Sequence, residues 1–72
     1  MNKEIIQKLI EQSLIGANVE VFGDDGRHFR VKVIYDGFLN KSKLHQHRMI
    51  YQALGDEMKE AIHALSIETA SQ

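Results

Sequence analysis

Residues 38–54 read Phe-Leu-Asn-Lys-Ser-Lys-Leu-His-Gln-His-Arg-Met-Ile-Tyr-Gln-Ala-Leu, the most informative stretch of the chain, and the spacing of its apolar residues predicts a helix. Ser42 is a suitable N-cap, since its hydroxyl can accept a hydrogen bond from the first free backbone N–H groups. Gly55 is expected to break or kink the helix, with a short further turn over residues 56–60. At ~100° per residue, one buried arc is predicted to contain Leu44, His47, Ile50, Tyr51, Leu54 and Met58.

Three further segments have the composition and alternation of β-strands. Residues 19–22 are rich in β-branched and aromatic side chains, and Gly-Asp-Asp-Gly at 23–26 then breaks the chain. From about His28 to residue 35, apolar side chains alternate with mainly basic ones, which predicts a hairpin whose second strand has one apolar face and one basic face. Residues 62–69 predict a third strand by the same alternation.

The N-terminal segment predicts a first helix over residues 3–15, with Asn2 as its N-cap and Gly16 as its stop. The predicted order is therefore α-β-β-α-(α)-β. We expect one α+β domain over residues 1–72, in which two helices pack on one face of a three-stranded mixed sheet. Residues 70–72 are expected to form a disordered tail.

The predicted topology places two histidines near each other. A strand-helix-strand connection within one sheet is nearly always a right-handed crossover between parallel strands, so the second and third strands should start at the same rim. His28 begins the second of these strands and His63 lies at the start of the third. Strict alternation would put the two rings on opposite faces, so the loop before His28 must curl over the rim for both to reach one metal ion.

The composition limits the classes of function. The chain has 72 residues, no cysteine and a formal charge of −1 from nine basic and ten acidic residues. Disulfides are excluded, and the charge argues against a protein that binds nucleic acid through many phosphate contacts. No apolar run approaches the ~18 residues that span a bilayer. We expect a cytoplasmic protein without membrane contact, and the sequence leaves a homodimer open.

Residue chemistry alone does not favour a metal-binding role for the histidines. A histidine in the position of His63 is more often half-buried and bonded to backbone than a metal ligand, and one in the position of His28 is usually solvated. His47 falls on the predicted apolar arc and is expected to bond a carbonyl or carboxylate inside the fold. His45 and His47 are not a helical metal pair, because a spacing of two points their side chains ~200° apart.

The other polar residues do not indicate catalysis. Asp24 and Asp25 are adjacent in one loop, where turn formation explains them better than acid–base chemistry does. No cysteine nucleophile, His-Glu-x-x-His or nucleophile elbow is present, so we predict that the chain is not an enzyme. A charged sheet is more often only solvated, but a basic patch for nucleic acid is the alternative, and its members would be Arg30, Lys32, Lys41, Lys43 and Arg48.

Four short motifs, taken together, resemble one family from end to end. They are Gly-Asp-Asp-Gly-Arg-His-Phe at 23–29, Phe-Leu-Asn-Lys-Ser at 38–42, Gln-His-Arg-Met-Ile-Tyr at 46–51 and Ile-His-Ala-Leu-Ser-Ile at 62–67. This combination resembles the BolA family. The chain departs from the family pattern at Asn40, where the family has glycine, and at Gln46, where it has arginine, and it lacks the family's C-terminal extension. The first two departures weaken a nucleic-acid role for this segment.

The resemblance implies a class II KH-like α+β fold and an adaptor that pairs with a monothiol glutaredoxin. In that picture the two proteins share a [2Fe-2S] cluster, with His63 matching the family's cluster ligand and His28 the loop histidine proposed as a second ligand. Because the chain has no cysteine, the sulfur ligands must come from the partner and glutathione, and the isolated chain binds no cluster. Some family members are described as transcriptional regulators of stress response and cell shape, which leaves DNA binding as the alternative.

Overall fold

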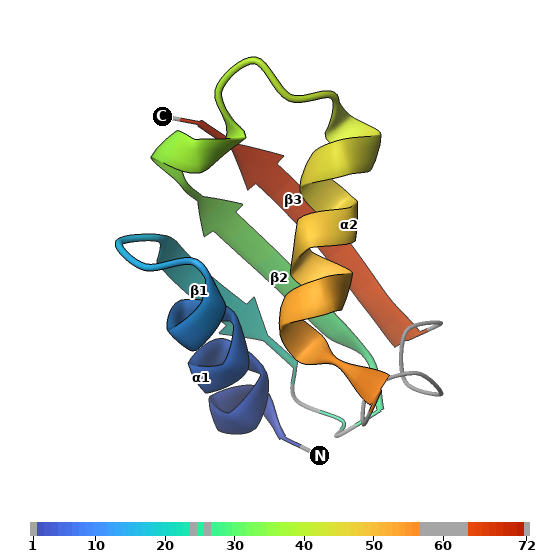
Figure 1. The fold of residues 1–72 in the computed structure, drawn as a ribbon. Helices are drawn as coiled ribbons and strands as arrows, with labels where there is room; N and C mark the ends of the chain where they lie inside the picture. Colours follow the sequence, from blue (N-terminus) through green and yellow to red (C-terminus); the bar gives the residue numbers. More distant parts are fainter. Residues whose placement is uncertain (1, 24, 26, 57–63, 72) are drawn as a thin grey trace.

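A computed structural model describes residues 2–23, 25, 27–56 and 64–71 of the chain (Figure 1). The predicted short turn at 56–60 falls mostly outside these residues, as do Asp24, Met58 and His63. The observed elements, in order, are α1 Lys3–Ser13, β1 Asn18–Phe22, β2 Phe29–Ile34, the 3-10 turn η1 Asp36–Phe38, α2 Lys43–Leu54 and β3 Leu65–Ala70.

Both helices begin at the predicted caps. The Asn2 Oδ1 accepts from the backbone N–H of Ile5 at 2.9 Å, and the Ser42 Oγ accepts from that of His45 at 3.1 Å. α1 ends at Ser13, two residues earlier than predicted, and the chain then turns through Gly16 at a φ of 89°. α2 ends at Leu54 and is capped by Gly55, whose φ of 73° suits a residue without a Cβ.

The sheet has the predicted mixed topology, with the strand order β1-β2-β3. β1 pairs antiparallel with β2, and β2 pairs parallel with β3 in a register that sets Phe29 opposite Leu65. Ala70, expected in a disordered tail, is the last residue of β3 and pairs with Ile34. The starting ends of β2 and β3 therefore form one rim of the sheet, as the crossover rule predicts.

Both helices cover the same face of the sheet (Figure 1), with α1 against β1 and α2, and α2 against β3. The prediction of an α+β fold with helices on one face is thus confirmed. Side chains from both layers meet in one apolar core, which consists of Ile6, Ile10, Leu14, Val19, Phe29, Val31, Val33, Phe38, Ile50 and Leu54.

The buried face of α2 differs from the predicted arc. Leu44 is 62% exposed, whereas Gln46 is only 6% exposed and shares the buried side with Ile50 and Leu54. Gln46 is buried at little cost because its amide is fully paired: Nε2 donates to the carbonyls of Phe38 and Lys41, and Oε1 accepts from the hydroxyl of Thr69. The helix is rotated about its axis relative to the prediction from apolar residues alone.

Candidate functional site

A shallow surface pocket lies at the rim where β2 and β3 begin. Its lining includes Phe22 and Arg30 from the hairpin, His28 from the loop before β2, and Ala64 and Ser66 from the other side. The parallel register brings these segments together although about 35 positions separate them in sequence. The predicted meeting of the two strand starts at this rim is confirmed, while His63 lies outside the described residues.

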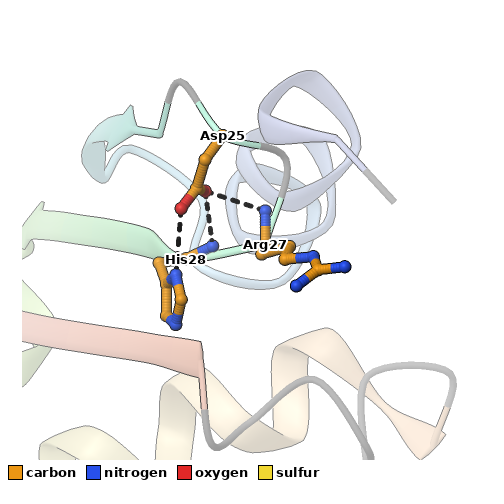
Figure 2. Close-up of polar contacts among 3 residues, drawn as sticks. All are labelled: Asp25, Arg27 and His28. Atoms are coloured by element: carbon orange, nitrogen blue, oxygen red, sulfur yellow. Dashed lines mark hydrogen bonds and ion pairs between the residues drawn. The ribbon is translucent and has the colours of Figure 1, made fainter.

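The loop before β2 is organised by one carboxylate. The Asp25 Oδ1 accepts hydrogen bonds from the backbone N–H of Arg27 at 2.9 Å and of His28 at 2.8 Å. Its second oxygen, Oδ2, lies 3.0 Å from the His28 Nδ1 (Figure 2). Asp25 therefore closes a turn, as predicted, and also contacts the ring of His28, the candidate metal ligand.

These contacts change the electrostatics of the loop. The backbone N–H of His28, then its ring, and then the backbone N–H of Arg27 hold the pKa of the Asp25 carboxyl well below its usual range. The lowering comes from local hydrogen bonds to the charged carboxylate. Burial has little part in it, because the side chains of Asp25 and His28 are both exposed to solvent. Asp25 consequently carries its negative charge throughout the range in which a histidine titrates.

His28 has the accessibility that a shared metal site requires. Its side chain is 75% exposed, and its second ring nitrogen, Nε2, lies on the side of the ring away from Asp25 (Figure 2). Within residues 2–23, 25, 27–56 and 64–71, no group of three or more His, Cys, Asp or Glu side chains could hold a metal ion. An accessible single imidazole suits a metal or cluster whose other ligands come from elsewhere.

The two histidines of α2 lie on different sides of the helix. His47 is half-buried and lines a surface depression with Lys43, Ile67 and Glu68, instead of lying within the apolar core. His45 is exposed and lines a separate depression with Arg48. Their separation agrees with the rejection of a helical metal pair.

The five cations of the alternative nucleic-acid surface fall into two sets. Arg30 and Lys32 alternate with buried residues along β2 and therefore lie on the open face of the sheet. Arg30 is also engaged there, with its Nε 3.6 Å from Glu68 Oε1 and its guanidinium 5.4 Å from the centre of the Phe22 ring. The second set belongs to the helical layer and the loop before it, and consists of Lys41, Lys43 and Arg48.

Three polar residues make contacts that were not predicted from the sequence. Asp25 orients His28, which the spacing of three between an aspartate and a histidine in a turn could have indicated. Gln46 links three segments through the hydrogen bonds of its amide, and no local sequence pattern predicts these bonds. Lys43 adds a further tie by donating from Nζ to the carbonyl of Thr69.

The fold and rim define a small α+β domain whose parallel strand pair presents a histidine-bearing loop at one end. The family model of BolA-like proteins matches residues 6–72, and the chain belongs to the BolA family. BolA-like proteins are a non-enzymatic family, in agreement with the prediction from the missing catalytic motifs. In the part of the chain that the structure describes, no helix combines the length and apolar character needed to cross a bilayer.

Individual relatives agree with this assignment. The chain is 40% identical to Protein BOLA2 of Arabidopsis thaliana over 73 residues, covering 97% of this chain and 77% of the relative. A bolA homologue from Coxiella burnetii has 37% identity and a TM-score of 0.81, over 97% of this chain and 90% of that one. The DNA-binding transcriptional regulator BolA of Escherichia coli is 40% identical over 42 residues. The chain spans 40% of that regulator and 12% of SufE-like protein 1 of A. thaliana.

Proposed function

We propose that this BolA-like chain is an adaptor that binds a monothiol glutaredoxin and shares a [2Fe-2S] cluster with it. The observation that best supports the proposal is the exposed imidazole of His28, held by Asp25 at the rim where β2 and β3 begin. His63, three residues before the pocket-lining Ser66, completes the proposed ligand pair on this side.

The residues fit a shared cluster better than a resident one. Two imidazoles leave two further cluster positions for sulfur, which this cysteine-free chain cannot supply and which the glutaredoxin thiolate and glutathione would provide. Imidazole ligands in place of thiolates raise the reduction potential of such a cluster. The chain's own part is to supply imidazole nitrogen in the neutral form that binds a metal, for which the exposed ring of His28 is suited.

The test is a titration of cluster-loaded monothiol glutaredoxin with the purified chain, followed by visible circular dichroism. We expect the spectrum to change with saturation near one equivalent, and His63→Ala to abolish the change. His28→Ala should weaken it, whereas His45→Ala, on the outer side of α2, should behave as the native chain. An unchanged glutaredoxin spectrum with the native chain would refute the adaptor role.

The alternative function is DNA binding, which the printed name of the E. coli relative assigns to that protein. Because the cations fall into two separate sets, the DNA-binding alternative predicts a different salt dependence for each set. A surface of Arg30 and Lys32 alone would give a log–log salt slope of about −2, and one of Lys41, Lys43 and Arg48 about −3. A slope near zero between 50 and 200 mM salt, measured on duplex DNA, would exclude both surfaces.

A further inference from the structure

The contacts of Asp25 constrain more than the backbone of the loop. Its Oδ1 is anchored by two N–H groups, from Arg27 at 2.9 Å and from His28 at 2.8 Å. With one oxygen fixed in this way, the direction of the other is fixed too, and Oδ2 lies 3.0 Å from the His28 Nδ1. One carboxylate thus holds both the main chain and the ring of the same histidine (Figure 2).

The chemistry of this pair decides where the ring proton lies. An ionised carboxylate can only accept hydrogen bonds, so the His28 nitrogen that faces it must be the donor. In the neutral ring the proton is therefore on Nδ1, and the lone pair is on Nε2. Neutral histidine in water favours the opposite tautomer, with the proton on Nε2, so this arrangement is imposed by Asp25.

We infer that Asp25 is a positioning residue that fixes His28 in the Nδ1–H tautomer and presents Nε2 as a ready metal donor. The inference rests on the proposed function for the identity of the metal, but the tautomer and the donor atom belong to the isolated chain. A carboxylate that accepts the second N–H of a metal-binding histidine orients the ring and raises its basicity as a ligand.

The position of the pair suits this role. His28 directly precedes Phe29, which is 6% exposed and anchors the start of β2 in the core. The ring itself is 75% exposed, so a metal held by a second protein can reach Nε2 without rearrangement of the fold. Asp25 and His28 are thus already in contact before the metal arrives, which reduces the entropy lost on binding.

Asp25→Asn is the informative variant because it preserves the turn and reverses the ring contact. The Asn Oδ1 can still accept from the two backbone N–H groups, while its Nδ2 donates where the carboxylate accepted. The ring must then accept through Nδ1 and carry its proton on Nε2, which weakens metal binding at Nε2. Asp36→Asn, at the other end of β2, is the charge-matched control, and far-ultraviolet circular dichroism checks that each variant is folded.

Two measurements on the isolated chain test the inference. Long-range ¹H–¹⁵N correlation spectra at a pH where imidazoles are neutral should show His28 as Nδ1–H in the native chain and in Asp36→Asn, but as Nε2–H in Asp25→Asn. Titration with Zn²⁺ alone should shift the His28 Nε2 resonance, and Asp25→Asn should weaken Zn²⁺ binding at that ring by about 10- to 100-fold.

Any of four results would overturn the inference. Two concern the tautomer: Nε2–H in the native chain, or an unchanged tautomer in Asp25→Asn. The other two concern the metal: Zn²⁺ affinity that the tautomer change does not alter, or coordination through Nδ1. Neither measurement uses glutaredoxin, so a failed adaptor role and a failed role of Asp25 give different results.

Discussion

Replacement of Gln46 by methionine tests whether the buried amide stabilises the fold through its hydrogen bonds. The side chain is 6% exposed, and its Nε2 donates to the Phe38 carbonyl at 3.2 Å and to the Lys41 carbonyl at 2.9 Å. Its Oε1 accepts from the Thr69 Oγ1 at 2.5 Å. Methionine has a similar length and volume but neither donates nor accepts strongly, so Gln46→Met removes these bonds with little change in packing.

The expected loss follows from the groups that remain without a partner. The Phe38 carbonyl still accepts from the Lys41 N–H at 3.0 Å, so its loss is small. The Lys41 carbonyl and the buried Thr69 hydroxyl lose the partners described above, at about 1–2 kcal/mol each. We therefore expect Gln46→Met to lower the free energy of unfolding by about 2–4 kcal/mol, and Tm by at least about 10 °C in a domain of this size.

Urea and thermal unfolding, followed by circular dichroism at 222 nm, measure this loss. Gln52→Met, on the exposed side of the same helix, is the control and should change stability by less than about 0.5 kcal/mol. In the double variant with Thr69→Val, the orphaned hydroxyl is absent, so about 1 kcal/mol should be recovered relative to additive losses. A Gln46→Met variant within 1 kcal/mol of the native chain, or strictly additive losses, would refute the reasoning.

Two further outcomes follow from the backbone and from the loop carboxylate. Asn40 has a φ of 66°, a conformation that glycine adopts freely, so Asn40→Gly should leave the urea midpoint nearly unchanged. Asn40→Val introduces a β-branched side chain there and should lower the free energy of unfolding by about 1–2 kcal/mol. Equal losses in the two variants would contradict this. The pKa of Asp25 lies below its usual value, so the carboxylate favours the folded chain fully above pH ~4 and its contribution is lost as the pH falls further. The urea midpoints of the native chain and Asp25→Asn should therefore approach each other progressively as the pH falls below about 4, and a constant difference would be the contrary result.

The fold was predictable because its determinants are local or topological. Asn2 and Ser42 cap the helices through hydrogen bonds to residues three positions away, and such contacts can be read from the sequence. The alternation of Phe29, Val31 and Val33 fixes the buried face of β2. The parallel pairing of β2 and β3 then follows from the handedness of crossovers.

The predicted buried face of α2 was wrong because a polar residue is buried or exposed according to hydrogen-bond partners that lie elsewhere in the fold. Leu44 is more apolar than Gln46, so periodicity alone places leucine inside. The partners of the amide come from the loop before the helix and from Thr69 on β3, far away in sequence. A buried glutamine can be recognised only when those carbonyls and that hydroxyl are in place.

Two of the departures from the family pattern, at Asn40 and Gln46, have structural explanations of the same kind. Asn40 replaces a glycine at a position with positive φ, a conformation that asparagine tolerates better than other residues with a Cβ. Gln46 replaces an arginine and forms the buried network. From the sequence, both departures weaken a nucleic-acid role, but their structural roles explain them without reference to any ligand.

The candidate site shows why an exposed ligand is harder to recognise than a buried network. A histidine that awaits a metal from another protein must be accessible, so its exposure resembles that of an ordinary surface histidine. His28 differs from an ordinary solvated histidine because an anchored carboxylate contacts its Nδ1 and fixes the ring. Topology predicted the rim and spacing could have predicted Asp25, but only the 3.0 Å contact indicates which nitrogen a metal would meet. Because the chain has no cysteine, the orientation of this imidazole is what the described residues contribute to the proposed site, and it can be measured on the isolated chain without a partner.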